Sequence, residues 1–317
     1  MKIIYNHKLF NNKMRKLFLI SLLWLGFTTI SVAQDFPLHT QYMYNKSFIN
    51  PGAVGVKGKI GLLLMHRSQW IGVEGAPMTS DLSFEYPFQK AAFGLDLIQD
   101  QNGPLSKYTG NLKFSYNLEL SYTTYLSLGV NAGVFYNQFN VNKLRIKDPG
   151  EELFANNVEE MNFDVGVGAF LYSETWYFGL STTNLNMQKY YPNLVNQYDK
   201  RLLHAYAMGG YNFEITRDMT LQPSVLVRYV DNLPISADFS VNMQWNETLV
   251  TGLAYRLNSA YSLLLGVNVS RQLHIGYAFD WDQNKIYMEN YGSHELFLRY
   301  YISKDENSLR YQNPRFF

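Results

Sequence analysis

The stretch ISADFSVNMQWN, residues 235–246, decides the fold because it alternates apolar and polar residues without interruption. Its apolar members are Ile235, Ala237, Phe239, Val241, Met243 and Trp245, and Ser, Asp, Asn and Gln fill the positions between them. Successive side chains of a β-strand point to opposite faces. The stretch therefore predicts a strand with one apolar face and one polar face.

The same alternation recurs at 126–136 and 261–270, whereas a sustained period of 3.6 residues is rare. We therefore expect few helices. Read in this way, the chain contains fourteen strands, at 59–68, 77–88, 90–100, 107–119, 122–138, 162–172, 175–185, 201–214, 219–230, 235–247, 248–258, 260–269, 271–281 and 291–303.

The connections between these strands sort by length. Tight turns are predicted at Gln89, 120–121, 173–174, 215–218, Glu247 and Ser270, and longer loops at 70–76, 101–106, 140–161, 186–200 and 282–290. Barrels of the bacterial outer membrane have short periplasmic turns and longer outer loops. The pattern predicts one antiparallel outer-membrane β-barrel over 59–303, with both chain ends on the periplasmic side.

Composition agrees with a membrane barrel. Charged residues make up 17% of the chain and aromatic residues 16%, whereas soluble domains carry about 25% charged residues. Four tryptophans fall at predicted strand ends, where barrels carry aromatic girdles: Trp70, Trp176, Trp245 and Trp281. A mean hydropathy of −0.21 excludes a helical membrane bundle. The absence of cysteine excludes disulfides, thiolate metal sites, cysteine nucleophiles and a lipoprotein anchor.

The N-terminus predicts export. Arg15 and Lys16 precede an apolar run at 17–30, and Ser31-Val32-Ala33 offers small residues before a cut. This is the pattern of a signal peptide over residues 1–33, with Met14 as a possible start; a membrane helix needs about 20 apolar residues. Cleavage leaves 27 − 5 = 22 basic and 26 acidic residues, a net charge of −4. Nucleic acid is therefore not an expected partner.

Two segments flank the predicted barrel. Residues 34–58 contain the breakers Pro37 and Pro51, and we expect them to plug the lumen or to lie in the periplasm. Residues 304–317 form an expected periplasmic tail. The polar strand faces carry charges of both signs, which predicts either a mutually paired, hydrated lumen or a docking site for a polypeptide or solute: Arg67, Asp81, Glu85, Asp96, Lys113, Glu119, Asp164, Arg228, Asp238, Arg256, Glu295 and Arg299.

Catalysis finds little support in the sequence. The histidines are scattered without a metal-binding spacing. Ser293-His294-Glu295 contains the residue types of a catalytic triad, but neighbours on a strand point to opposite faces and cannot form its relay. We predict no enzyme, no cofactor and no metal. Gly129, Gly133, Gly166 and Gly168 are expected to relieve crowding or permit strand bending.

Several motifs resemble the PorP/SprF family of type IX secretion system outer-membrane proteins from Bacteroidetes. They are Gln41-Tyr42-Met43, Asn50-Pro51-Gly52, Arg67-Ser68-Gln69-Trp70, Gly75-Ala76-Pro77-Met78-Thr79, Gln222-Pro223-Ser224, Tyr255-Arg256 and Gly292-Ser293-His294-Glu295. The resemblance covers essentially the whole mature chain. Gly52, where alanine is more usual, and the acidic insertion 148–160 depart from the family pattern.

The resemblance implies a non-enzymatic barrel in the outer membrane that works with the type IX apparatus. Its implied partners are the ring components, a peptidoglycan-binding protein and a secreted surface protein or adhesin, including adhesins of gliding motility. The candidate structural or partner-binding residues are Asn50, Pro51, Arg67, Gln69, Trp70, Gly75, Ala76, Pro77, His294 and Glu295. The rival function on the same architecture is a passive porin or a hydrophobic-solute transporter.

Overall fold

A computed structural model describes residues 39–143, 157–183, 185, 203–231, 233–283 and 290–302. The predicted signal peptide and the predicted tail 304–317 lie outside these residues. Among the described residues the strands are β1 Ile60–Ser68, β2 Met78–Phe88, β3 Ala91–Asn102, β4 Leu105–Glu119, β5 Tyr125–Phe139, β6 Val158–Tyr172, β7 Trp176–Thr182, β8 His204–Tyr211, β9 Phe213–Thr216, β10 Met219–Val230, β11 Ser236–Trp245, β12 Leu249–Arg256, β13 Ala260–Asn268, β14 Leu273–Asp282 and β15 Ser293–Ile302.

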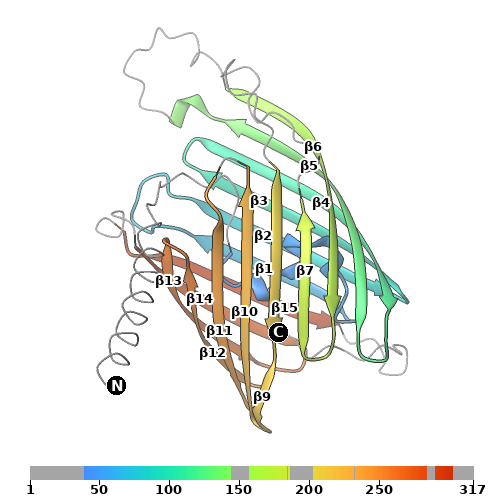
Figure 1. Ribbon diagram of the computed structural model, residues 1–317. Helices are drawn as coiled ribbons and strands as arrows, with labels where there is room; N and C mark the ends of the chain where they lie inside the picture. Colours follow the sequence, from blue (N-terminus) through green and yellow to red (C-terminus); the bar gives the residue numbers. More distant parts are fainter. Residues whose placement is uncertain are drawn as a thin grey trace, which may run out of the picture. The chain divides into compact units, whose positions relative to one another are not determined.

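The strands form one closed antiparallel ring (Figure 1). The first strand, β1, pairs with the last, β15, and the ladder continues without a break through β10 and β11. β9 continues β8 beyond Asn212, and both pair with β10. Counted as one strand, β8 and β9 reduce the fifteen segments to 15 − 1 = 14 strands around the barrel. The predicted fourteen-stranded barrel is confirmed. Closure leaves no edge strand with unpaired backbone groups, as hydrocarbon requires.

The barrel carries its apolar side chains on the outside. On β11, Phe239 is 48% exposed and Val241 is 47% exposed, whereas Asp238, Ser240 and Asn242, which alternate with them, are buried. Other strands repeat this alternation, with exposed Leu, Phe and Val between buried residues that are polar, small or apolar. A soluble protein would have the opposite distribution. An apolar exterior around a polar interior is stable in lipid.

The predicted sorting of loops is only partly right. The expected long loop 101–106 is instead a two-residue turn, because Gln101 pairs with Ser106 and Asn102 pairs with Leu105. Gly103 takes the positive φ of 57° that this turn needs. Residues 257–259 also join β12 to β13 tightly on this side. The other connections on this side, 69–77, 140–157, 183–203, 231–235 and 283–292, are longer.

Two further boundaries differ from the prediction. β6 begins at Val158, so Glu159 and Glu160 of the acidic insertion belong to the strand, where they pair with Gln138 and Asn137. The connection 120–124 is longer than the predicted two residues. The tryptophans do lie at strand ends: Trp176 begins β7, Trp245 ends β11, Trp281 is next to last in β14, and Trp70 follows β1.

Residues 39–59, here called the N-terminal segment, form no strand. The segment contains three short helical turns, η1 Tyr42–Tyr44, α2 Lys46–Ile49 and η2 Pro51–Ala53. Asn50 ends α2 and caps η2, since its side-chain Oδ1 accepts a hydrogen bond of 2.8 Å from the Gly52 N–H. None of the helices in the described part of the chain is long and apolar enough to cross a membrane.

Inward-facing side chains of the barrel hold the backbone of this segment. Lys113 donates to the carbonyl of Ser47 at 2.6 Å. Ser181 donates to Ile49 at 2.8 Å, and Ser115 donates to Val54 at 2.9 Å. Residues 39–56 are buried apart from the half-buried Tyr44, and Figure 1 shows the short blue helices of the segment within the ring of strands. Irregular backbone at membrane depth is stable when the protein itself supplies its hydrogen bonds.

Close approach to the wall explains one glycine. A Cβ atom on Gly129 of β5 would overlap the backbone of Pro51 and Gly52. The N-terminal segment can reach β5 only because this position has no side chain. Crowding thus accounts for Gly129, as the sequence led us to expect.

We expect Gly129→Val to lower the free energy of unfolding by about 1–3 kcal/mol, because the added side chain must displace the N-terminal segment. Unfolding of the purified barrel in guanidinium chloride measures this change. Gly110→Val is the matched control: Gly110 lies on β4, and the nearest atom to its added Cβ is in the Leu97 side chain at 3.8 Å. Equal unfolding midpoints for the two variants would contradict the close packing of the segment.

Candidate functional site: a buried ion-pair cluster

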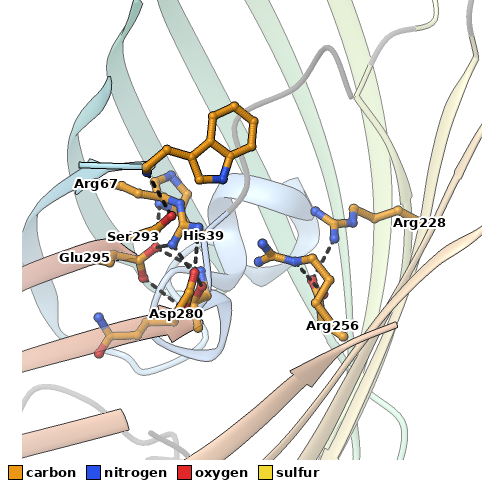
Figure 2. Close-up of polar contacts among 11 residues, drawn as sticks. His39, Arg67, Arg228, Arg256, Asp280, Ser293 and Glu295 are labelled. Carbon is orange, nitrogen blue, oxygen red and sulfur yellow. Dashed lines mark hydrogen bonds and ion pairs between the residues drawn. The ribbon is translucent and has the colours of Figure 1, made fainter. Parts of the chain in front are cut away.

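Barrel closure brings two distant motifs together. Arg67 of β1 and Glu295 of β15 are direct cross-strand partners, and Arg67 Nη1 donates to Glu295 Oε2 at 3.2 Å. Asp280 of β14 accepts from Arg67 Nη2 at 2.6 Å. All three side chains are almost completely buried. The guanidinium thus bridges two carboxylates from neighbouring strands inside the barrel (Figure 2).

The N-terminal segment completes this cluster. The backbone N–H groups of Thr40 and Gln41 donate to the two oxygens of Glu295, at 2.9 and 2.8 Å. The Thr40 hydroxyl accepts from Arg67 Nη1 at 2.9 Å and donates to Asp280 at 2.7 Å. A buried carboxylate is stable when cations and N–H donors surround it. The cluster therefore clamps the start of the N-terminal segment to β1, β14 and β15.

His39 adds a second cation. Its Nε2 lies 2.6 Å from Asp81 Oδ2 of β2, and its Nδ1 lies 3.5 Å from Glu295 Oε2. Burial lowers the pKa of His39, but the charges and hydrogen bonds of Asp81 and Glu295 outweigh burial and raise the pKa to about 10. The imidazole is consequently charged at neutral pH and pairs with carboxylates on two strands.

Two further ion-pair groups lie in the interior. Arg228 of β10 and Arg256 of β12 both donate to Asp238 of β11, each at 2.8 Å, and Figure 2 shows the two guanidinium groups converging. Lys113 of β4 forms an ion pair with Asp96 of β3. These contacts agree with a mutually paired lumen, one of the two expectations from the sequence, the other being a docking site for a polypeptide or solute. Of the charges predicted on polar strand faces, Glu85, Asp164 and Arg299 are half-buried. Glu119 continues the face of Lys113 and Ser115 on β4, but it is exposed because it is the last residue of the strand.

The other predicted motif residues organise the first long loop. The backbone N–H of Gln69 donates to the Pro77 carbonyl at 2.9 Å, and Gly75 accepts from the Gly103 N–H at 2.9 Å. Trp70 has a φ of 46°, and its backbone N–H donates to Ser293 Oγ at 3.2 Å. Ala76 donates its N–H to the Val73 carbonyl at 3.2 Å. The loop is thereby tied both to itself and to the start of β15.

Asn50 and Pro51 lie at another part of the wall. The Asn50 side-chain amide donates to two main-chain carbonyls, Ala169 of β6 at 3.0 Å and Leu180 of β7 at 3.2 Å. Pro51 packs against β5 at Gly129. These residues therefore dock the middle of the N-terminal segment, while the Arg67 cluster docks its beginning.

His294 does not join the cluster. It is only half-buried, and its Nδ1 lies 2.6 Å from the Tyr277 hydroxyl. Ser293 and Glu295 on either side are buried in the interior. The residue types of a triad are thus on opposite faces of β15, as expected for a strand. In the described part of the chain, no group of three or more His, Asp or Glu residues could hold a metal ion.

Sequence reasoning did not place His39, Thr40, Gln41 and Asp280 in a site. Gln41 begins a family motif, and Asp280 alternates with apolar neighbours on its strand. Those signals mark the residues as unusual, but they do not show which carboxylate meets which cation. That pairing depends on the register between β1, β14 and β15.

Removal of the Arg67 guanidinium, the central cation of the cluster, should destabilise the folded barrel. We expect Arg67→Met to lower the free energy of unfolding by about 3–5 kcal/mol, because it leaves two buried carboxylates without their guanidinium. Adding Glu295→Gln to this variant should cost less than the sum of the two single changes, since the two residues interact. Denaturant unfolding measures each value. Arg271→Met, at an exposed turn, serves as the control and should change stability by less than about 0.5 kcal/mol.

The raised pKa of His39 predicts a pH-dependent stability. Its charged form is favoured in the folded state, so its contribution is fully present below its ordinary pKa of 6.5 and is lost as the pH rises through about 10. The stability difference between the wild type and His39→Gln should therefore be larger at pH 6 than at pH 10. Unfolding curves of both proteins at the two pH values test this. A difference that is constant or grows with pH would contradict the charged imidazole.

Comparison with known proteins agrees with the fold. The family described as type IX secretion system membrane protein PorP/SprF matches residues 31–300. Among curated proteins none matches this sequence.

Several solved structures share the barrel. The toluene transporter TbuX of Ralstonia pickettii has a TM-score of 0.50 at 10% identity, covering 85% of this chain and 95% of that one. The monoaromatic hydrocarbon channel CymD also has a TM-score of 0.50 at 10% identity, with coverages of 86% and 95%. A FadL homologue of Pseudomonas aeruginosa reaches 0.45 at 12% identity, with coverages of 84% and 94%. At these identities the likeness shows the fold alone.

The closed barrel with its apolar exterior is a protein of the outer membrane, and the family match spans most of the chain. Both the predicted localisation and the resemblance found in the motifs are confirmed. This chain belongs to the PorP/SprF family of type IX secretion system membrane proteins.

Proposed function

We propose that this chain is a non-enzymatic component of the type IX secretion system that supports export or surface anchoring of a secreted protein, such as an adhesin of gliding motility. In this proposal the N-terminal segment plugs the barrel, and the barrel is a scaffold. Its expected partners are the periplasmic ring components, a peptidoglycan-binding protein and the exported surface protein.

The observation that carries the proposal is the packing of the N-terminal segment against the inner wall of the barrel. Its first residues are clamped by Arg67 and Glu295, and its middle is held by the Asn50 amide on β6 and β7. One interior cavity beside it has a volume of about 50 Å³, which leaves room for a few water molecules. A segment fixed at several points by buried polar contacts suits a rigid anchor better than an open channel.

The chemistry of the interior also favours a scaffold. Four buried cations of the barrel wall, Arg67, Lys113, Arg228 and Arg256, are held in ion pairs with carboxylates of other strands. Charges already committed to each other are poorly placed for general acid–base catalysis. The proposal therefore includes no catalytic residue and no cofactor.

The rival function is transport of hydrophobic solutes. It is favoured by the likeness to TbuX, a toluene transporter, and CymD, a monoaromatic hydrocarbon channel. Such a transporter needs a route for its solute past the N-terminal segment. Conductance and binding partners separate the two functions.

In planar bilayers we expect the wild-type barrel to be nearly silent, because the N-terminal segment obstructs the lumen. Arg67→Met should produce intermittent openings, since it weakens the clamp on that segment. Arg271→Met, the exposed-turn control, should stay as silent as the wild type. Single-channel recording measures all three, and steady conductance of the wild type would favour the porin or transporter.

Co-purification tests the partnership directly. A tagged chain extracted from native outer membranes in mild detergent should recover type IX ring components or one large surface protein, identified by mass spectrometry. An unrelated tagged barrel from the same membranes is the control. Recovery of the barrel alone, under conditions in which other membrane complexes survive, would overturn the secretion function.

A further inference from the structure

The interior of the barrel near its short turns carries a concentration of positive charge. Three cationic groups surround the ring of Tyr301: Lys57 Nζ at 5.4 Å from the ring centroid, Lys59 Nζ at 5.9 Å and Arg299 Cζ at 5.6 Å. Arg299 also donates to the Tyr301 hydroxyl at 2.9 Å. We call these three cations and Tyr301 the basic site.

The register of the strands gives the location of the basic site. Tyr301 pairs with Gly61 at the start of β1, and its backbone N–H donates at 2.8 Å to Gln272 in the short turn before β14. The Arg67 cluster lies at the other ends of the same strands. Short turns face the periplasm in outer-membrane barrels. The basic site therefore lies toward the periplasmic mouth.

The chain directs two lysines to this place by a tight turn. Gly55 and Gly58 have φ values of 69° and 64°, and the Gly58 N–H donates to the Gly55 carbonyl at 2.9 Å. This turn ends the N-terminal segment and leads into β1 with Lys57 and Lys59 beside Tyr301. Glycine at these two positions allows the positive φ values of the turn, and the turn places Lys57 and Lys59 beside Tyr301.

The basic site differs from the rest of the interior in its charge balance. Arg67, Lys113, Arg228 and Arg256 each contact a carboxylate. In the described part of the chain, Lys57, Lys59 and Arg299 form no ion pair, and Glu85 is the one carboxylate whose charge acts on Lys57. Three basic groups beside one acid are an excess of basic groups that the folded chain leaves without carboxylate partners. Cation–π contacts with one ring offset only part of this repulsion.

The electrostatics of Lys57 agree with this excess. Burial, followed by the charges of Arg299 and Lys46, lowers the pKa of Lys57 well below its usual range, and the opposing effect of Glu85 does not compensate. Glu85 already accepts a hydrogen bond of 3.2 Å from the Gly55 N–H. An added anion at this place would favour the protonated form of Lys57 and offset the repulsion between the neighbouring cations.

We propose that the basic site binds carboxylates of an acidic polypeptide segment from a periplasmic partner, an inference that rests on the proposed secretion function. Arg299 and Tyr301 alternate with the lipid-facing Leu298 and Tyr300 along β15, so the barrel wall separates the site from lipid. Its ligand therefore comes from the aqueous periplasm. Lysine and arginine side chains gathered around one ring can pair with successive carboxylates of a peptide.

A fluorescent hexaglutamate peptide tests the site on the purified full chain in detergent, with hexaglutamine as the uncharged probe. We expect hexaglutamate to bind, and the triple variant Lys57→Gln, Lys59→Gln, Arg299→Gln to weaken binding at least tenfold. The matched control neutralises three exposed cations at turns on the same end, Lys90→Gln, Arg217→Gln and Arg271→Gln, and should change affinity less than twofold. Fluorescence anisotropy measures each affinity. Binding should also weaken as salt is added.

Three results would overturn the proposal: no binding of hexaglutamate by the wild type, equal weakening by the two triple variants, or inorganic phosphate binding as tightly as hexaglutamate in calorimetry. Retention of the folded, heat-modifiable form on gels shows that each variant is intact. If the triple variant does not fold, Lys59→Gln alone, at a half-buried position, should weaken binding at least threefold, and unchanged binding would overturn the proposal. These assays use no secretion component, so their failure is distinguishable from a failed co-purification.

Discussion

Every feature of this protein depends on the need to satisfy backbone hydrogen bonds in hydrocarbon. Strand edges left open in lipid would cost several kcal/mol for each unpaired group. The chain meets this constraint by pairing β1 with β15 and carrying the ladder through β10 and β11 without a break. Once the ring is closed, alternation along each strand sends apolar side chains to the lipid and polar ones to the interior. The lipid around the barrel thus explains why polar side chains face its interior.

A polar interior can hold an irregular chain segment that an apolar core could not. Lysine and serine side chains of the wall donate to carbonyls of the N-terminal segment, and Glu295 accepts from two of its N–H groups. These contacts replace the hydrogen bonds that a helix or sheet would supply. Glycine at position 129 brings the backbone against the wall. The segment and the barrel therefore form one packed unit with shared hydrogen bonds.

The distribution of charge divides the interior into two regions. Toward the long loops, Arg67 lies among Asp280, Glu295 and the segment, and His39 bridges Asp81 and Glu295. Toward the short turns, Lys57, Lys59 and Arg299 gather around Tyr301 without an ion pair. The first region fixes the N-terminal segment by internal pairing, and the second presents positive charge toward the periplasm. In the proposed function, the first region holds the N-terminal segment in the barrel and the second is the place where a periplasmic partner binds.

The alternation along 235–246, which recurs at 126–136 and 261–270, was enough to predict strands with two faces, because side-chain direction in a strand is set by the local backbone. The sorting of the connections by length added the prediction of a barrel. The sequence also placed Arg67 and Glu295 on polar faces. It did not show that they meet, since 228 positions separate them and only closure of the ring makes their strands neighbours. The loop predicted at 101–106 was wrong because strand pairing extended further than local propensity indicated. Which cation pairs with which carboxylate, and how His39 reaches Asp81, was decided by the tertiary structure, because ion pairing depends on distances between strands that no local pattern encodes.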